Sequence, residues 1–224
     1  MKLSFIYFDF PFWRAEVARI ALFMGGVDFE NRKISIEEFQ RVKKDGYLDD
    51  GTIIPFHQFP CLVINGVSVV QTAGIARFCG KISGLYPRNN DVLAAEIDQF
   101  LDIATDLTVI IASAGKEESE DQKRIYREKL LEGELARKLT ILDKAIKDDQ
   151  DWILGTDIGL ADIAIWRLMG WVSSGMLAGI PIDILKSYSN ISRICVSVDE
   201  HPKIKEWVRK TYPQDYVRGN YLGK

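Results

Sequence analysis

The chain has few of the residues that build disulfide frameworks and metal sites. Among its 224 residues are three cysteines, Cys61, Cys79 and Cys195, and no two of them form a Cys-x-x-Cys pattern. An odd number of cysteines without that spacing argues against a disulfide framework or a zinc site and indicates a reducing compartment. The two histidines, His57 and His201, are too few and too scattered for a metal site or a catalytic triad. We therefore expect no metal.

The sequence also lacks long apolar runs and a strong charge of either sign. No uncharged apolar run is long enough to span a bilayer. The apolar start of the chain is interrupted by Asp9, Arg14 and Glu16, which makes it too short for a signal peptide. A formal net charge of −3 gives no electrostatic reason to bind nucleic acid or an anionic membrane. These absences predict a cytoplasmic protein without nucleic-acid or membrane partners.

The composition is that of an ordinary folded protein. Hydrophobic residues make up 47% of the chain and charged residues 27%, unlike the composition of disordered proteins. A chain of this length forms either one large domain or two of ordinary size, with an ample core.

The most informative stretch runs from Gln58 to Arg77. Two short runs of β-forming residues flank Asn65-Gly66, which accepts positive φ at both turn positions and predicts a hairpin. Pro60 precedes the first run, where it restricts the residue before it and cannot donate a ladder hydrogen bond. The second run leads directly into a helix that starts near Gln71, and the first amides of a helix favour a carboxylate or phosphate. This combination suits a small peptide-like ligand.

The first third of the chain predicts an α/β domain. The expected elements are a strand over 3–8, a helix over 14–25, a strand over 29–36, a helix over 37–44, the hairpin, and a helix from Gln71 to about Ile82. A βαβ unit followed by a ββα unit is the thioredoxin arrangement. Residues 1–82 are therefore predicted to form a thioredoxin-like domain with the element order βαβαββα.

The rest of the chain predicts an all-α domain. Residues 83–90 contain Gly84, Pro87 and two asparagines, and read as a linker. Apolar residues recur at helical spacing in a helix that begins at Asp91 and in a second that runs from about Glu118 to Lys147, and the rest of the chain to residue 224 has no convincing strand-like run. A third helix start is predicted at Gly159, because Asp162 stands three residues later, where its carboxylate reaches back to the cap amide.

The stretch around the hairpin resembles the glutathione-binding half of the cytosolic glutathione transferases. The shared pattern includes Phe59-Pro60, Asn65-Gly66, Gln71-Thr72 and Ile75-Ala76-Arg77. The resemblance implies a thioredoxin-like domain, glutathione as co-substrate and a cis peptide bond before Pro60. It further implies that the Phe59 backbone pairs with the cysteinyl part of glutathione, and that Gln71 and Thr72 hold its γ-glutamyl carboxylate.

The resemblance implies further glutathione contacts. Arg14 is similar to the helix-opening arginine that braces the γ-glutamyl side. Phe39 and Lys43 stand where the sigma class has a tryptophan and a lysine facing the glycyl carboxylate, and Gln58 is a further candidate at the glycyl end. Asp98 resembles the aspartate that reaches across a homodimer to the glutathione amino group. Plainer alternatives are surface charges for Arg14 and Lys43, and a polar helix face for Asp98.

Tyr7, at the end of the first strand, is the candidate catalytic residue. A free thiol, with a pKa near ~8.5, is mostly protonated at neutral pH, and a hydroxyl that donates to the sulfur favours the thiolate. From spacing alone, Tyr7 is equally a core aromatic. The resemblance to Tyr-type transferases, whose strand-closing tyrosine precedes a helix opening with arginine, favours catalysis. The segment Arg14-Ala15-Glu16-Val17 is similar to that helix start in the sigma class.

One departure from the family pattern lies between Tyr7 and Arg14, which are separated by one residue more than usual. We expect the loop to bulge and Tyr7 to keep its place, because strand register is fixed by the core face and loops absorb insertions cheaply. The aromatics of this loop, Phe10, Phe12 and Trp13, either line the pocket of an apolar co-substrate or pack in the core. Phe56 either plugs into a partner subunit, as in the mu class, or lies at the pocket entrance.

We therefore expect a cytoplasmic, homodimeric glutathione transferase of Tyr type, nearest to the sigma class, that conjugates glutathione to hydrophobic electrophiles. Residues 1–82 would bind glutathione, and residues 91–224 would contribute to the hydrophobic co-substrate site. Two alternatives stay open. One is a glutathione-dependent isomerase, such as a prostaglandin synthase, that uses the same thiolate. The other is a ligand-binding or structural relative without catalysis.

Overall fold

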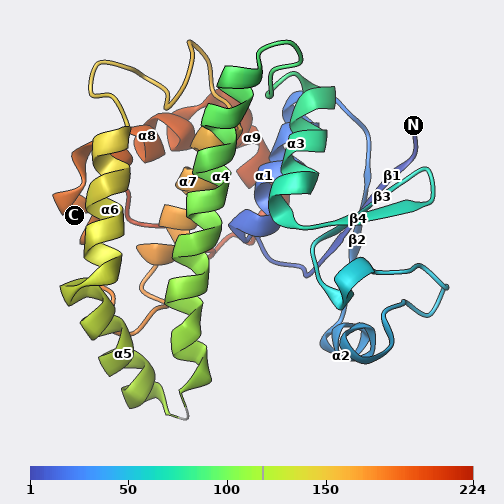
Figure 1. Ribbon diagram of the computed structural model, residues 1–224, viewed down its shortest axis with the longest axis horizontal. Coiled ribbons are helices and arrows are strands. Elements are labelled where there is room, and N and C mark those ends of the chain that lie inside the picture. Colours follow the sequence, from blue (N-terminus) through green and yellow to red (C-terminus); the bar gives the residue numbers. More distant parts are fainter. Residues whose placement is uncertain (118, 224) are drawn as a thin grey trace. The chain divides into compact units, whose positions relative to one another are not determined.

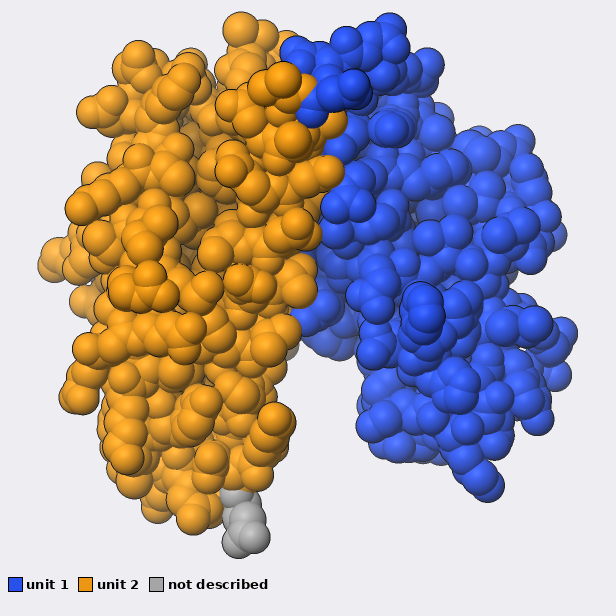
Figure 2. All heavy atoms as spheres, in the orientation of Figure 1, with its two compact units in different colours: residues 1–91 blue, residues 92–224 orange. Residues whose placement is uncertain are grey.

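The structure is a computed structural model that describes residues 1–117 and 119–223 (Figure 1). It divides into two compact units, residues 1–91 and residues 92–224, which Figure 2 shows in different colours. Each unit is described by itself below.

The first unit has the predicted order of strands and helices. Its elements are β1 (Leu3–Tyr7), α1 (Trp13–Met24), β2 (Glu30–Lys33), α2 (Ile36–Asp45), the 3-10 turn η1 (Pro55–His57), β3 (Cys61–Ile64), β4 (Val67–Val70) and α3 (Thr72–Ser83). The four strands form one mixed sheet in the order β2-β1-β3-β4. This is the thioredoxin-like arrangement that the sequence predicts.

The pairing of the strands confirms the predicted hairpin. β3 and β4 are antiparallel and Ile64 pairs with Val67, so that Asn65 and Gly66 form the two-residue turn. Both turn residues have positive φ, 49° and 89° respectively, as this turn requires. β1 pairs in parallel with β2 and antiparallel with β3, which places β1 at the centre of the sheet.

The two faces of the sheet are covered differently. Phe5 and Tyr7 lie on the face that meets α1, because the guanidinium of Arg19 on α1 lies over both rings. α1 and α3 pack against each other. Ile6 points to the other face, where it joins a buried cluster with Val42 of α2 and neighbouring apolar residues. This alternation is the period-2 pattern of a strand that is buried on both faces.

The second unit is helical. Its elements are α4 (Asp91–Ala112), η2 (Ser113–Lys116), α5 (Glu120–Glu132), α6 (Glu134–Ala145), α7 (Leu160–Val172), η3 (Ile184–Ser187), α8 (Ser189–Glu200) and α9 (Pro202–Thr211). No strand occurs in its described residues. None of the helices in the described ranges is long and apolar enough to cross a membrane.

The structure corrects one prediction in this unit. The single helix expected from about Glu118 to Lys147 is two helices, α5 and α6, which meet at Gly133; Glu118 itself lies outside the described residues. Gly133 has φ −138° and ψ −106°, far from helical values. Glycine is about 1 kcal/mol less favourable than alanine inside a helix. The charged residues on both sides of Gly133 continue the helical pattern, so the periodicity of the sequence does not indicate the break.

Helix α7 begins as predicted at Gly159. Asp162 is buried and one of its carboxylate oxygens accepts from the Gly159 amide at 2.8 Å. Its other oxygen accepts from the Ile153 amide, also at 2.8 Å. One carboxylate therefore both caps the helix and holds the chain segment that leads to it. Nearly all of α7 is buried, as expected for a helix that is apolar on every side.

We predict that Asp162→Ala lowers the free energy of unfolding by about 3 kcal/mol, because it leaves the buried Ile153 amide and the partly buried Gly159 amide without their acceptor. Denaturant unfolding followed by circular dichroism measures this change. A matched control is Asp121→Ala, since Asp121 also lies in the first turn of a helix but is exposed. The control should change stability by less than about 0.5 kcal/mol. Equal effects of the two substitutions would contradict the role given to Asp162.

Candidate active site

Three strand ends meet at one edge of the sheet in the first unit. Ile6 of β1 pairs with Cys61 of β3, and Cys61 pairs with Val70 of β4. Extending both registers by one residue places Tyr7, Pro60 and Gln71 side by side. These three candidate site residues therefore occupy neighbouring positions at one sheet edge.

Two helix N-termini lie at the same edge. α1 follows the end of β1 and α3 follows the end of β4, and these two strands run in the same direction because each is antiparallel to β3. The first amides of both helices are therefore on the side of the sheet where Tyr7, Pro60 and Gln71 meet. Helix N-termini carry a partial positive charge and unpaired N–H groups, so this edge favours an anionic ligand.

The segment before β3 offers an extended backbone. The Phe59-Pro60 peptide bond is cis, as the resemblance implied, and Pro60 is buried. Among the described residues, no backbone group donates to or accepts from the N–H and C=O of Phe59. These groups can therefore pair with an extended ligand that lies along the edge, in the manner of an added strand.

The start of α3 contains a polar group without a partner. The Thr72 side chain is buried, and its Oγ1 has no hydrogen-bond partner in the described part of the chain. A buried hydroxyl without a partner is costly, and a ligand oxygen at the helix start would satisfy it. Gln71 precedes Thr72 with a positive φ of 76°, and its side-chain amide donates to Oε1 of Gln58 at 3.0 Å.

Tyr7 is buried, with 6% of its surface exposed. Burial raises the pKa of its hydroxyl to about 12, against the opposing effect of the positive charges of Arg14 and, less strongly, Arg19. Burial in turn lowers the pKa of Arg14, and Tyr7 opposes that shift. The extra residue in the loop therefore leaves Tyr7 and Arg14 close enough to interact. With a pKa this high, the hydroxyl keeps its proton at neutral pH and is available as a hydrogen-bond donor.

The loop between β1 and α1 is lined with aromatic rings. Phe10 lies 5.8 Å from Tyr7 and 5.8 Å from Phe12 between ring centroids, and Phe8 lies 5.4 Å from Tyr7. Phe10 is 44% exposed and Phe12 partly exposed, whereas Trp13 has no exposed surface. Phe10 and Phe12 are thus accessible to an apolar ligand. The burial of Trp13 favours its core-packing alternative.

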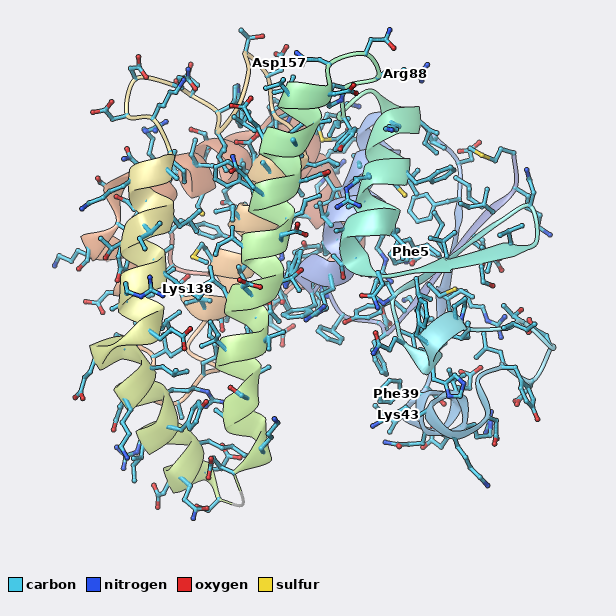
Figure 3. All side chains as sticks on the ribbon, in the orientation of Figure 1. Phe5, Phe39, Lys43, Arg88, Lys138 and Asp157 are labelled. Carbon is cyan, nitrogen blue, oxygen red and sulfur yellow. The ribbon has the colours of Figure 1, made fainter. Side chains whose placement is uncertain are left out.

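Phe39 and Lys43 lie together on α2 (Figure 3). The Lys43 ammonium is 5.5 Å from the centroid of the Phe39 ring, and that ring is 6.2 Å from the ring of Phe59. The structure therefore brings this pair to the segment before β3. Asp98 lies half-buried on α4, in the second unit.

Two other hydroxyl side chains of the first unit, Ser4 and Tyr47, do not lie at this edge. Ser4 is three residues before Tyr7 on the same strand and so points to the other face of the sheet. Tyr47 is 55% exposed and lies in the loop after α2, where its backbone bridges to Ile53. Of Ser4, Tyr7 and Tyr47, only Tyr7 ends a strand at this sheet edge.

Sequence reasoning missed two buried charges beneath Tyr7. Glu16 and Arg19 on α1 are 2% and 3% exposed and form an ion pair of 3.3 Å. Their spacing of three residues is typical of exposed helix pairs. The only signal of burial was that both residues stand among the apolar positions of α1, with Ala15, Val17, Ala18 and Ile20 around them.

The cysteines take no part in this edge as reactive groups. All three are buried and unbridged, and burial raises the pKa of Cys61 to about 11 and that of Cys79 to about 12. No group of histidine, cysteine and carboxylate side chains that could hold a metal ion is found among the described residues. What the edge offers is a place for an extended, anionic, peptide-like ligand beside a hydroxyl donor.

Comparison with known protein families agrees with this geometry. Residues 3–80 match the family profile "Glutathione S-transferase, N-terminal domain", and residues 105–211 match "Glutathione S-transferase, C-terminal domain". Together the two profiles span most of the chain. The chain belongs to the glutathione S-transferase family.

Individual relatives are similar over nearly their whole length. Glutathione S-transferase 1 of Ascaris suum is 26% identical over 207 residues, which cover 90% of this chain and 93% of the relative. The hematopoietic prostaglandin D synthase of Gallus gallus is 25% identical over 197 residues, covering 88% and 90%. Among solved structures, prostaglandin synthase D of Nilaparvata lugens is 25% identical with a TM-score of 0.78, covering 95% of this chain and 99% of the other.

Proposed function

We propose that the protein is a glutathione transferase of Tyr type, nearest to the sigma class, that conjugates the glutathione thiolate to hydrophobic electrophiles. The observation that carries this proposal is the alignment of Tyr7, Pro60 and Gln71 at one sheet edge. It puts a hydroxyl donor, a free backbone edge and a helix N-terminus within the length of one tripeptide.

In this proposal glutathione lies along the edge in an extended conformation. Its γ-glutamyl carboxylate occupies the start of α3, where it accepts hydrogen bonds from Gln71 and from Thr72 Oγ1, the hydroxyl that has no partner among the described residues. Its cysteinyl residue pairs with the backbone of Phe59. Lys43 and Gln58 serve the glycyl carboxylate, with Phe39 beneath Lys43, and Arg14 braces the γ-glutamyl side.

The chemistry follows from the state of Tyr7. Its hydroxyl keeps its proton at neutral pH because its pKa lies near 12, and it donates that proton in a hydrogen bond to the glutathione sulfur. The hydrogen bond, the Arg14 charge and the two helix N-termini stabilise the sulfur anion relative to the thiol. The thiol proton leaves to solvent, the thiolate electron pair forms the carbon–sulfur bond, and the displaced group departs with the electrons of its own bond.

The apolar co-substrate lies beside the loop aromatics in this proposal. Phe10 and Phe12 have exposed ring surface close to Tyr7, and apolar contact with such rings holds a hydrophobic molecule while the thiolate attacks.

The second candidate is a glutathione-dependent isomerase. It is favoured by the similarity to the prostaglandin D synthases of Gallus gallus and Nilaparvata lugens. The same thiolate would add to a carbon of the substrate and leave again after rearrangement, so the glutathione site is shared. Parallel assays of conjugation with aromatic halides and of prostaglandin isomerisation distinguish the two.

We also propose that the protein is a cytoplasmic homodimer in which Asp98 of one protomer reaches the glutathione of the other. Phe56 supports an interface role, since 75% of its surface is exposed although it is apolar. Its φ of 55° is an unfavourable backbone conformation for a residue other than glycine, and a partner subunit would cover the exposed ring.

We predict that Thr72→Val weakens glutathione binding by about 1.5–3 kcal/mol, the usual worth of a hydrogen bond to a charged group. The valine fills the same space, and the lost hydroxyl has no hydrogen-bond partner among the described residues, so thermal stability should not fall. Calorimetry measures both quantities. Thr72→Ser is the matched control and should bind like the wild type. Unchanged affinity in Thr72→Val would remove this residue from the site.

We predict that Tyr7→Phe lowers kcat for conjugation about a hundredfold, the cost of losing one donor to a developing anion. The ring and its packing stay, so the Kd for glutathione should change little, and the pH–rate profile should move to higher pH, towards the pKa of a free thiol. Tyr47→Phe controls for loss of a hydroxyl elsewhere in the domain. A wild-type rate and profile in Tyr7→Phe, with intact glutathione binding, would favour the non-catalytic alternative or another donor.

We predict that Phe56→Ser raises the dissociation constant of the dimer at least tenfold, because a buried aromatic anchor at an interface is typically worth about 2 kcal/mol or more. Analytical ultracentrifugation measures the constant. Ile53→Ser, which changes an equally exposed apolar residue of the same loop, should have a smaller effect. A wild-type monomer at micromolar concentration with full activity would contradict the dimer.

A further inference from the structure

A buried ion pair lies against the ring of Tyr7. Glu16 and Arg19 are almost completely buried, and Arg19 Nη1 lies 3.3 Å from Glu16 Oε1. Taking two charges out of water can cost more than their attraction returns, and an apolar pair of the same volume is often at least as stable. The pair therefore needs a reason other than stability.

The contacts of Arg19 suggest that reason. Its guanidinium carbon lies 5.1 Å from the ring centroid of Phe5, which Figure 3 labels on β1, and 5.8 Å from that of Tyr7. Its Nη2 donates to the carbonyl of Phe8 at 3.4 Å. One planar group thus contacts the Tyr7 ring and also the first residue of the loop that follows it.

This loop is the place where the chain has its extra residue. A longer loop has more conformations open to it. Movement of its first residue, Phe8, would displace the adjacent Tyr7. The hydrogen bond from buried Arg19 to the Phe8 carbonyl restrains this residue. Glu16, one turn earlier on α1, fixes the guanidinium in turn, while Arg19 Nε has no partner among the described residues.

We propose that Arg19, held by Glu16, is a positioning residue that fixes the Tyr7 ring and the Phe8 carbonyl so that the Tyr7 hydroxyl points at the thiol of bound glutathione. This inference rests on the proposed function. Arg19 touches neither glutathione nor the electrophile, and acts only through Tyr7. A displacement of about 1 Å at a reacting group can cost a hundredfold in rate, so the loss of this support is expected to be measurable.

Other charges near Tyr7 define what the test must separate. Arg14 on α1 is the stronger electrostatic partner of Tyr7, ahead of Arg19. Lys33 is the β2 partner of Tyr7 in the sheet register, and its ammonium forms an ion pair with Asp9 at 2.8 Å. Because Glu16 neutralises Arg19, removing both together leaves the net charge around Tyr7 unchanged. An effect of the double substitution then reports positioning rather than charge.

The test uses the full-length double variant Glu16→Gln/Arg19→Met, which leaves no unpaired buried charge. We expect kcat for conjugation to fall about ten- to a hundredfold with little change in the Kd for glutathione, since the γ-glutamyl and glycyl contacts lie elsewhere. The pH–rate profile should move to higher pH. Arg127→Met is the matched control, because Arg127 is also a buried arginine that donates to a backbone carbonyl, that of Ala178 at 3.1 Å, in the helical unit. It should leave kcat and the profile unchanged.

A double-mutant cycle with Tyr7→Phe makes the inference falsifiable even if the variant is less stable. If Arg19 acts through Tyr7, the triple variant, which combines the double substitution with Tyr7→Phe, should have the same kcat as the Tyr7→Phe single variant. Additive effects, or a folded double variant with wild-type kcat and pH profile, overturn the inference. If Tyr7→Phe alone has the wild-type rate, the proposed function of Tyr7 fails first, and the two failures are thus distinguished.

Discussion

The pairing of β1, β3 and β4 is the constraint on which the candidate active site depends. Because the register is fixed by residues buried on both faces, Tyr7, Pro60 and Gln71 come to the same edge although more than sixty residues separate the first from the last. A slip of one residue in β1 would turn Tyr7 away from α1 and towards the other face. The two helix N-termini follow from the same constraint, since β1 and β4 must end on the same side.

Burial then decides what each group at this edge can do. It keeps the Tyr7 hydroxyl protonated, with a pKa of about 12, which suits a hydrogen-bond donor and not a base. It leaves Thr72 Oγ1 without a hydrogen-bond partner in residues 1–117 and 119–223, so that a ligand oxygen can satisfy it. It also places Glu16 and Arg19 together under the Tyr7 ring. The same desolvation that makes these groups costly in the free protein makes them effective once an anionic ligand is bound.

The sequence predicted those features that are encoded within a few neighbouring residues. Asn65-Gly66 predicts its turn by backbone chemistry, Asp162 predicts a helix start by its distance from Gly159, and the Pro60 and Gln71 motifs identify the edge. It did not predict the break at Gly133, because charged residues on both sides continue the helical pattern through it. Nor did it reveal the Glu16–Arg19 pair, since the burial of two charges depends on how α1 packs on β1. Whether the longer loop displaces Tyr7 is likewise a question of tertiary contacts that spacing alone does not answer.

The central claim is that this sheet edge stabilises a thiolate on bound glutathione. The most direct test is to titrate the thiolate absorbance of glutathione bound to the wild-type protein, with S-methylglutathione as the blank. The account predicts a thiol pKa at least one unit below the free value of about 8.5, so that a several-fold larger fraction of the bound thiol than of the free thiol is ionised at neutral pH. A bound thiol that titrates at the free value would contradict the account, even if glutathione binds tightly.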